Sequence, residues 1–292
     1  MLAALMLLGA ACGDDGGDDT GGTGGDDATE VEEFPEGSTM AKIQERGTLI
    51  AGVKYDVPPF GFKNPQTDEV EGFDVDISQE IADRLGVELE ATEAISDNRI
   101  PFLIDGTVDI VASTMTITTD RDVEIDFSEP YYIANGRILV GEGTDDVETL
   151  EDLKGKSACT ALGSTYEGLL KEVKGIDVQL PETYSECFEL IQNGSVDAVV
   201  TDDVILTGMI IQDDTLSLVG EELTVEPYGI GLPEGDTDMQ EFVNSVLQEL
   251  IDDDTYDTIY QEWVGQYTGT ETEVPEMTLE EALELRPCEE LC

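Results

Sequence analysis

The sequence predicts an α/β protein with two comparable halves. Short apolar runs that are typical of strands alternate with longer segments in which apolar residues recur at helical spacing. Residues 102 to 114, FLIDGTVDIVAST, and residues 189 to 202, ELIQNGSVDAVVTD, also share a helix end, a glycine turn, Val-Asp, an apolar strand and a polar end. One pair of similar segments is too few for a solenoid, so two α/β lobes fit it better.

The elements follow in order from near Ser38. The run TLIAGV at residues 48 to 53 predicts the first strand, and residues 73 to 86 predict a helix with Gly86 as its C-terminal stop. Further strands are expected at residues 108 to 113, 137 to 142, 157 to 162, 196 to 202, 216 to 220 and 229 to 233. Further helices are expected at residues 164 to 173, 184 to 194, 202 to 210, 239 to 251, 255 to 265 and, in the tail, Leu279 to Leu285.

The composition limits the possible functions. The 292 residues include 68 acids, 13 lysines and arginines and no histidine, which gives a net charge of -55. This balance argues against nucleic-acid binding, which needs clustered basic residues, and excludes histidine-based catalysis and histidine-ligated metals. No cofactor or metal is expected. The acids are spread along the chain, which predicts a solvated surface and suits a high-salt habitat where counterions screen the repulsion.

The N-terminus predicts export and anchoring. Residues 1 to 12, MLAALMLLGAAC, resemble a bacterial lipoprotein signal with cleavage after Ala11 and lipidation of Cys12. Residues 13 to 37 are rich in Gly, Asp and Thr, and predict a disordered tether. We therefore expect a folded part held at the outer face of a membrane.

Cysteine usage agrees with an oxidising compartment. Apart from Cys12, the four cysteines are Cys159, Cys187, Cys288 and Cys292. The preferred pairing is Cys159 with Cys187 and Cys288 with Cys292, although four cysteines allow three connectivities. A zinc site is the alternative, and the spacings without histidine disfavour it.

Polar residues follow several predicted strands. Lys54 follows the first strand, while Ser113, Thr114, Thr116 and Arg121 follow the strand at 108 to 113, and Asp202 ends its counterpart in the second half. In open α/β sheets ligands bind at the carboxyl ends of strands. A cation with hydroxyl groups would thus face a carboxylate, which is the complement of a zwitterion.

Arginine and aspartate have alternative roles at these positions. The guanidinium of Arg121 can bind a ligand carboxylate through two parallel hydrogen bonds, but it can also form a surface ion pair with Asp120, Asp122 or Glu124. Asp202 can accept from a ligand ammonium, or it can cap the helix that follows. Because bases are scarce and five hydroxyl residues precede Arg121, we favour the binding role.

Five motifs together resemble a known family. They are VEGFDVDISQEIADRLG, TITTDRDVEIDFSEPYY, GSTYE, VDAVVTDD and EPYGIGLP, and the resemblance extends from about Lys42 to Gln266. The sequence resembles the amino-acid-binding family (family 3) of extracellular solute-binding proteins that serve ABC importers. This resemblance implies a two-lobed periplasmic-binding-protein type II fold with a two-stranded hinge, closing around one amino acid and docking on a permease.

The resemblance also implies domain boundaries and roles. Lobe 1 would comprise residues 38 to 134 plus 228 to 272, lobe 2 residues 135 to 227, and the tail residues 273 to 292. Carried over by position, Arg121 and Thr116 hold the α-carboxylate and Asp202 holds the α-ammonium. Three residues that open a helix, Gly163, Ser164 and Thr165, would present N–H groups to the carboxylate.

Specificity for the ligand side chain is expected to depend on Lys54. VKYDVPPFGF, DNRIPFL and the positions of Cys159 and Cys187 look most like the glutamate-binding lipoproteins of actinobacteria. Lys54 with Arg99 would neutralise a second carboxylate, and a neutral amide would leave the charge unpaired. The alternatives are that Lys54 points outward and that Arg99 pairs with Asp97. Tyr55 and Phe60 are expected to serve packing more than ligand contact.

The expected function is therefore binding and delivery of L-glutamate or L-aspartate, not catalysis. Contacts made to both lobes shift the hinge equilibrium toward closure. A dehydratase-like enzyme on the same fold, a binder of a neutral amino acid and a sensor ectodomain are the alternatives. An enzyme would need an acid or base beside the reacting atom.

Overall fold

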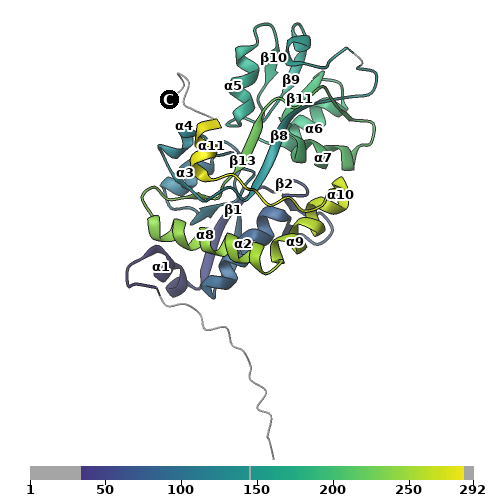
Figure 1. Cartoon of the computed structure of the whole chain (residues 1–292). Coiled ribbons are helices and arrows are strands. Elements are labelled where there is room, and N and C mark those ends of the chain that lie inside the picture. The colour runs from purple at the N-terminus through teal and green to yellow at the C-terminus, as the bar shows by residue number, and fades with distance from the viewer. Residues whose placement is uncertain (1–33, 145, 286–292) are drawn as a thin grey trace, which may run out of the picture. The chain divides into compact units, whose positions relative to one another are not determined.

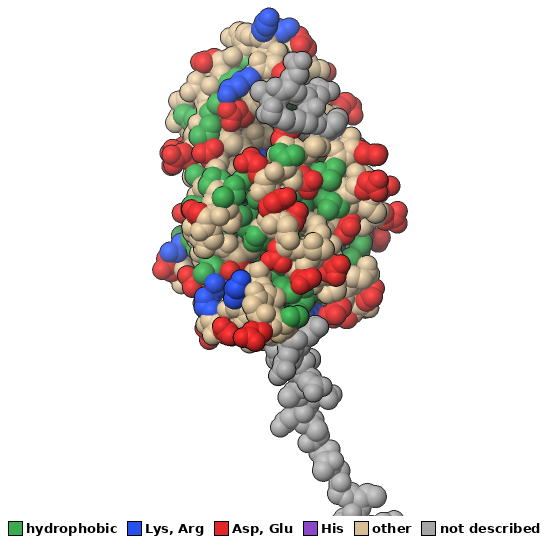
Figure 2. Space-filling model, turned by 90° about the vertical axis from the view of Figure 1, so that its left-hand side faces the viewer, with side chains coloured by type: hydrophobic (Ala, Val, Ile, Leu, Met, Phe, Trp, Pro, Cys, Tyr) green, Lys and Arg blue, Asp and Glu red, His purple; other side chains and the backbone are tan. Residues whose placement is uncertain are grey.

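The computed structural model describes residues 34 to 144 and 146 to 285. The predicted signal with Cys12, the tether up to residue 33, Cys288 and Cys292 lie outside the described residues. Within the described ranges, no helix combines the length and apolar character needed to cross a membrane. Figure 2 shows acidic side chains scattered over the visible face, as the composition predicts.

The first sheet has five strands in the order β5-β1-β6-β14-β7. The strands are β1 (Thr48–Val53), β5 (Glu88–Glu93), β6 (Ile110–Val111), β7 (Asp126–Phe127) and β14 (Gly231–Leu232). Strands β5 and β6 pair parallel with β1, and β14 pairs antiparallel with β6 and β7. A small antiparallel sheet of β2 (Asp56–Val57), β3 (Gly61–Lys63) and β4 (Val70–Glu71) follows β1 along the chain.

The second sheet has the order β10-β9-β11-β8-β12, with β13 also paired to β8. Its strands are β8 (Tyr132–Val140), β9 (Ser157–Cys159), β10 (Asp177–Gln179), β11 (Ala198–Asp202), β12 (Ser217–Val219) and β13 (Val225–Tyr228). The first half of β8 pairs with β13 and the second half pairs with β11 and β12. Strands β8 and β13 are therefore the two hinge strands that the fold class requires.

Helices cover both faces of the second sheet (Figure 1). Alternate residues of a strand face opposite sides, so Val199 of β11 packs in one apolar cluster with Cys187, Ile191 and Leu206, whereas Val200 packs in another with α5. The helices here are η1 (Leu150–Leu153, a 3-10 helix), α5 (Thr165–Glu172), α6 (Tyr184–Gln192) and α7 (Asp203–Gln212). A disulfide between Cys159 and Cys187 joins α6 to β9, which confirms that predicted pairing.

The helices around the first sheet include the long helix expected at residues 73 to 86. This helix, α2 (Phe73–Leu85), buries its apolar face and ends at Gly86, whose φ of 71° is the left-handed conformation that glycine adopts easily. The others are α1 (Thr39–Arg46), α3 (Arg99–Ile104), α4 (Thr119–Asp122), α8 (Thr237–Asp252), α9 (Thr255–Tyr260), the π-helix η2 (Gln261–Gly265), α10 (Gln266–Thr268) and α11 (Leu279–Leu285).

Most of the predicted elements occur and differ in length, but several observed elements were not predicted, among them β5, β10, β13 and α1. Strand β6 covers only two residues of the predicted 108 to 113, because the chain then turns into the loop at Ser113 and Thr114. Strand β8 begins five residues before the predicted start at 137, because it continues through the hinge. The first strand and the tail helix have the predicted bounds. The lobe boundaries stay a prediction. Strands β8 and β13 pair with each other in the region where the chain is expected to pass from one lobe to the other.

Candidate functional site

The predicted site residues follow the carboxyl ends of strands in both sheets. Lys54 follows β1, Ser113 and Thr114 follow β6, and Asp202 ends β11. Strands β1 and β6 are parallel, as are β9 and β11. Their ends therefore point polar residues toward the same region, as open α/β sheets do at their binding crevices.

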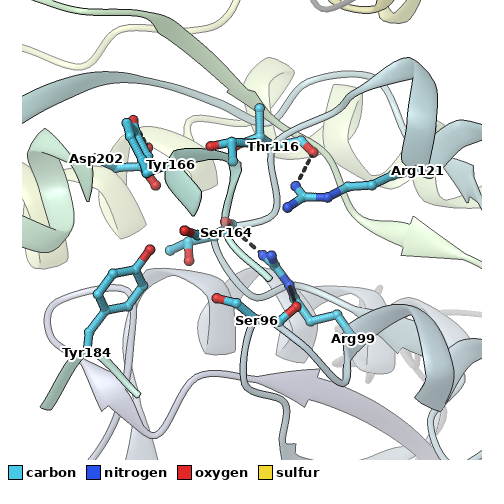
Figure 3. A pocket seen from close by; sticks show the side chains of 10 residues that line it. Ser96, Arg99, Thr116, Arg121, Ser164, Tyr166, Tyr184 and Asp202 are labelled. Atoms are coloured by element: carbon cyan, nitrogen blue, oxygen red, sulfur yellow. Dashed lines mark hydrogen bonds between the residues drawn. The ribbon is translucent and has the colours of Figure 1, made fainter. Parts of the chain in front are cut away.

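A narrow pocket of about 10 Å³ lies among these residues (Figure 3). Its lining is polar and comes from both halves of the chain: Ser96, Arg99, Thr114, Thr116, Arg121, Ser164, Thr165, Tyr166, Tyr184 and Asp202. Seven of the predicted site residues line it, whereas Lys54, Ser113 and Gly163 do not. Figure 3 shows the two guanidinium groups on one side and Asp202 with Tyr166 on the other.

Arg121 projects toward the pocket from the single-turn helix α4. Its Nη1 donates to the carbonyl of Thr116 at 2.7 Å and its Nη2 to the carbonyl of Gly163 at 3.1 Å. The guanidinium is thus directed at the pocket and at the loop of the second half. The guanidinium lies partly buried in the pocket lining, so the binding role of Arg121 stays a prediction that its position allows.

Arg99 belongs to the same wall and is buried, with 2% of its surface exposed. It donates to four carbonyl groups, those of Ser96, Ser113, Thr114 and Gly163. Among the described residues Arg99 forms no ion pair, so the alternative of a pair with Asp97 is wrong. Burial, and then the charge of Arg121, lower the pKa of Arg99 to about 9.

Lys54 is also buried, so the alternative that it points outward is wrong. Its Nζ donates to Ser96 Oγ at 2.8 Å and lies 5.8 Å from the centre of the Tyr184 ring. Because Ser96 and Tyr184 line the pocket, Lys54 is one layer behind the surface of the pocket. Burial, and then the charge of Arg99, lower the pKa of Lys54 to about 7.

Asp202 carries the carboxylate on the opposite side. Tyr166 and Tyr228 each donate a hydroxyl hydrogen bond of 2.7 Å, one to each carboxylate oxygen. Asp202 stands at the N-cap position of α7, yet its side chain makes no capping hydrogen bond, so the capping alternative fails. Burial raises the pKa of Asp202 to about 6, and the two tyrosine hydrogen bonds oppose that rise.

A buried aspartate that the sequence reasoning missed shapes the loop after β6. Asp74 in the first turn of α2 accepts from the Thr114 N–H at 2.9 Å and from the Tyr131 hydroxyl at 2.7 Å. Thr114 has a φ of 43°, which is uncommon for a residue with a side chain. Asp74 accepts from the N–H of Thr114 and Arg99 donates to its carbonyl, so both charged side chains hold the strained loop. The hydroxyl of Ser113 donates to Ala94 O and is therefore engaged outside the pocket.

The loop at Gly163 approaches the first half closely. A Cβ on Gly163, whose φ is 76°, would lie 2.7 Å from Asp97 Cα, so glycine is required there. The N–H of Gly163 donates to Glu167, and that of Ser164 donates to Ala161 O. These N–H groups can therefore bind a ligand carboxylate, as predicted, only if they first release their present acceptors, Glu167 and Ala161 O.

Three lining residues were not predicted: Ser96, Tyr166 and Tyr184. Tyr184 sits in the first turn of α6 and its hydroxyl accepts from Thr201 at 2.7 Å. A weak signal was present, since the segments GSTYE and TYSEC each place a tyrosine at a helix start beside strand ends. Tyr55 and Phe60 lie outside the lining, and Phe60 packs against Phe73, Tyr132 and Tyr228, as expected of a packing residue.

Metal-ligating clusters of three or more Cys, Asp or Glu do not occur within residues 34 to 144 and 146 to 285. The zinc alternative for Cys159 and Cys187 fails because their sulfurs are joined to each other. The donor set of the pocket, guanidinium, hydroxyl and one carboxylate, fits an organic zwitterion better than a metal ion.

Comparison with known families decides the assignment. Residues 49 to 266 match the model of bacterial extracellular solute-binding proteins, family 3. The chain belongs to family 3 of the bacterial extracellular solute-binding proteins.

Relatives of this family-3 solute-binding protein bind different amino acids. It is 37% identical over 270 residues to the glutamine-binding protein GlnH of Bacillus subtilis, covering 91% of this chain and 94% of the relative. It is 33% identical over 284 residues to the glutamate-binding protein GluB of Corynebacterium glutamicum, covering 91% and 90%. A solved ancestral arginine-binding protein bound to glutamine shares 41% identity and a TM-score of 0.72, covering 75% of this chain and 99% of that one.

The walls of the pocket in this family-3 protein carry groups that are complementary to the charged groups of an amino acid. The pocket offers a guanidinium for a carboxylate and a carboxylate for an ammonium, on opposite walls. The family is extracellular and its relatives are transport binding proteins, so an amino-acid ligand and ABC permease partners are implied.

Proposed function

We propose that this protein is the binding component of an ABC amino-acid importer and that its ligand is an acidic amino acid, L-glutamate or L-aspartate. The observation that carries this choice is the pair of buried cations Lys54 and Arg99, which form no ion pair with a carboxylate in the described part of the chain. Two unpaired buried cations are costly, and a ligand side-chain carboxylate would offset that cost.

The backbone groups of the ligand are assigned to the remaining charges. Arg121 with Thr116 binds the α-carboxylate, and Asp202 binds the α-ammonium, with Thr114 beside it. Ser113, whose hydroxyl donates to Ala94 O, supports the loop and does not contact the ligand. The two tyrosines that donate to Asp202 leave each of its oxygens with acceptor capacity for the ammonium. Gly163, Ser164 and Thr165 complete the carboxylate site after exchange of their hydrogen bonds.

Closure follows from the distribution of these groups between the proposed lobes. Arg99 and Arg121 belong to lobe 1 (residues 38 to 134 plus 228 to 272), and Asp202 belongs to lobe 2 (residues 135 to 227). A ligand that engages both walls gains contacts only in the closed state, so it shifts the hinge equilibrium toward closure. The permease would then take the ligand from the closed form.

A neutral ligand is the main alternative, because relatives are named for glutamine, cystine and arginine as well as glutamate. A glutamine amide would leave Lys54 and Arg99 without a counter-charge, so the buried cations favour an acid. An enzyme on the same fold is the other alternative. It would use Lys54, whose lowered pKa suits a general base, but the relatives are named as binding proteins, and the charged walls of the pocket complement a free amino acid without a catalytic base.

The cellular setting is proposed from the sequence. A lipid on Cys12 and the acidic tether would hold the protein at the outer face of the membrane. The net charge of -55 should slow the approach of an anionic ligand at low ionic strength, and screening at high salt should relieve it. We therefore expect the association rate of L-glutamate to rise with salt, and a flat or falling rate in stopped-flow experiments contradicts this part.

The test is calorimetric titration of the chain from residue 13 in molar salt with L-glutamate, L-aspartate and L-glutamine. Tight binding of an acidic ligand with weak binding of glutamine is expected. Lys54→Asp should weaken the acidic ligands far more than glutamine. Lys63→Asp is the matched control, since Lys63 is exposed and pairs with Asp68 at the surface. Equal losses for all ligands with Lys54→Asp would make that lysine structural.

A further inference from the structure

The tail contains a helix that packs against the element carrying Arg121. The match to the family model ends at residue 266, whereas α11 spans Leu279–Leu285. Figure 1 shows α11 beside α3 and α4. Between α10 and α11 the chain stays attached to the first half, because the hydroxyl of Tyr260 hydrogen-bonds Thr270. The described tail is thus a docked segment outside the stretch that defines the family.

The helix α4 needs outside support. It has only four residues, Thr119–Asp122, and none of them is buried. A single helical turn is unstable in water because nucleation costs more than its few hydrogen bonds return. Its internal support includes the cap, in which Thr118 Oγ1 accepts from the Arg121 N–H at 3.3 Å, and a few backbone hydrogen bonds of the turn.

The outside support comes from α11 in two ways. Ile117 and Ile125 flank α4 and are fully buried. They belong to the same apolar cluster as Ala282 of α11, and Leu279 and Leu283 of α11 pack against this cluster. In addition, the hydroxyl of Thr119 donates to the carbonyl of Leu283 at 3.2 Å. The tail helix therefore contacts both the flanks of α4 and the turn itself.

The helix α11 is itself fixed to the first half at its start. The Leu279 N–H donates to Glu129 Oε2 at 2.6 Å, and the Glu129 N–H donates to Asn244 of α8. Ala282 in the middle of α11 is fully buried. These contacts make α11 a rigid brace between the end of β7 and α4.

We propose that α11 is a positioning element of the binding site, which orders α4 so that the Arg121 guanidinium is held toward the pocket before the ligand arrives. The inference rests on the proposed role of Arg121 in binding the α-carboxylate. Without the brace, the Arg121 side chain and the α4 turn become ordered only when the ligand binds. The entropy cost of this ordering should weaken affinity on the order of two- to tenfold. Because every amino acid carries an α-carboxylate, the loss should be the same for all ligands.

The test uses the chain from residue 13 with two variants of α11. Ala282→Asp places a charge in the apolar cluster and should undock the helix. Leu285→Asp introduces the same side chain on the same helix at a position that is 45% exposed, and serves as the matched control. Hydrogen exchange of the ligand-free protein should quicken at the amides of residues 118 to 125 in Ala282→Asp and remain unchanged there in Leu285→Asp.

A second pair of variants places no charge in the apolar cluster, so the test does not depend on the folding of Ala282→Asp. Thr119→Val removes the hydroxyl that donates to Leu283, whereas Thr119→Ser keeps it. The valine variant should show the faster exchange and the uniform loss of affinity for L-glutamate and L-glutamine, and the serine variant should restore both. Amides of β1 and β11 should exchange as in the wild type in all four variants.

The outcomes separate this inference from the proposed ligand. Unchanged exchange at residues 118 to 125 in Ala282→Asp overturns the brace. Faster exchange there with unchanged affinity overturns the positioning role. If glutamine binds and glutamate does not, the acidic-ligand proposal fails, yet a uniform affinity loss in Ala282→Asp still supports the brace.

Discussion

The carboxylate of Asp56 caps the helix that begins at Tyr184. Its Oδ2 atom accepts from the Tyr184 N–H at 2.8 Å and from the Ser185 N–H at 3.0 Å. Asp56 lies in β2, in the sequence of proposed lobe 1, while α6 is tied by the disulfide to β9 of the second sheet. The contact joins an anion to the positive end of a helix dipole across the two halves, so it can exist only when they are close.

Asp56→Asn should therefore weaken every ligand by a similar factor, roughly two- to fivefold, because it removes the charge at the helix end and destabilises the closed state. The measurement is the dissociation constant and dissociation rate for L-glutamate and L-glutamine, together with small-angle scattering of the ligand-bound form. Glu88→Gln, at an exposed position of β5, is the control. If only one ligand loses affinity, Asp56 contributes to ligand specificity and not to closure.

Binding of an acidic ligand should be coupled to proton uptake. The pKa of Lys54 is about 7 in the ligand-free protein, so at pH 8 the amine is mostly neutral. A ligand carboxylate nearby raises that pKa, and Lys54 then takes up a proton, approaching one per ligand. Titrations at pH 8 in buffers of different ionisation enthalpy measure this number. We expect much less uptake with glutamine, and almost none with glutamate in Lys54→Met; equal uptake in that variant contradicts the assignment.

Affinity should fall as the pH drops through about 6. Asp202 must be ionised to hold the ligand ammonium, and its pKa in the ligand-free protein is about 6, so each further pH unit lowers the affinity by up to about tenfold. The Tyr228 hydrogen bond lowers this pKa, so Tyr228→Phe should move the fall to higher pH. Tyr55→Phe, whose hydroxyl bonds Ala91 O outside the pocket, should leave the profile unchanged. If affinity depends on pH in the same way in Tyr228→Phe and Tyr55→Phe, the proposed role of Asp202 in ligand binding is wrong.

The sequence predicts the site where a residue's position follows from a strand end. Thr114 and Asp202 line the pocket for this reason, and Thr116 and Arg121 line it from the segment that follows β6. It does not predict contacts whose partners lie far apart in the chain. Asp74 reads as one more polar residue of an amphipathic helix, and only the folded chain brings it to the Thr114 N–H.

The same limit applies to burial. The sequence places Lys54 after a strand but does not decide its depth, which depends on how Ser96 and Tyr184 pack over it. It likewise predicts the bounds of the tail helix from apolar spacing, whereas the docking of Ala282 near α4 depends on a surface formed by Ile117 and Ile125. Periodicity identifies elements, and tertiary packing decides which of their side chains meet.

Removal of the buried amine should stabilise the ligand-free protein. Lys54→Met keeps much of the side-chain volume and removes the desolvation cost, so the melting temperature should rise by roughly 2 to 4 °C per kcal/mol recovered, while glutamate affinity falls. The pKa of Lys54 is lower in the folded state than in the unfolded chain, so the wild type loses stability as the pH falls from about 10.5 through about 7. The advantage of Lys54→Met should therefore be large near pH 7 and shrink toward pH 10. Thermal unfolding between pH 7 and pH 10 measures this stability advantage, with Lys63→Met as the exposed control. If Lys54→Met is less stable than the wild type at pH 7, the lysine has a stabilising partner in the ligand-free protein.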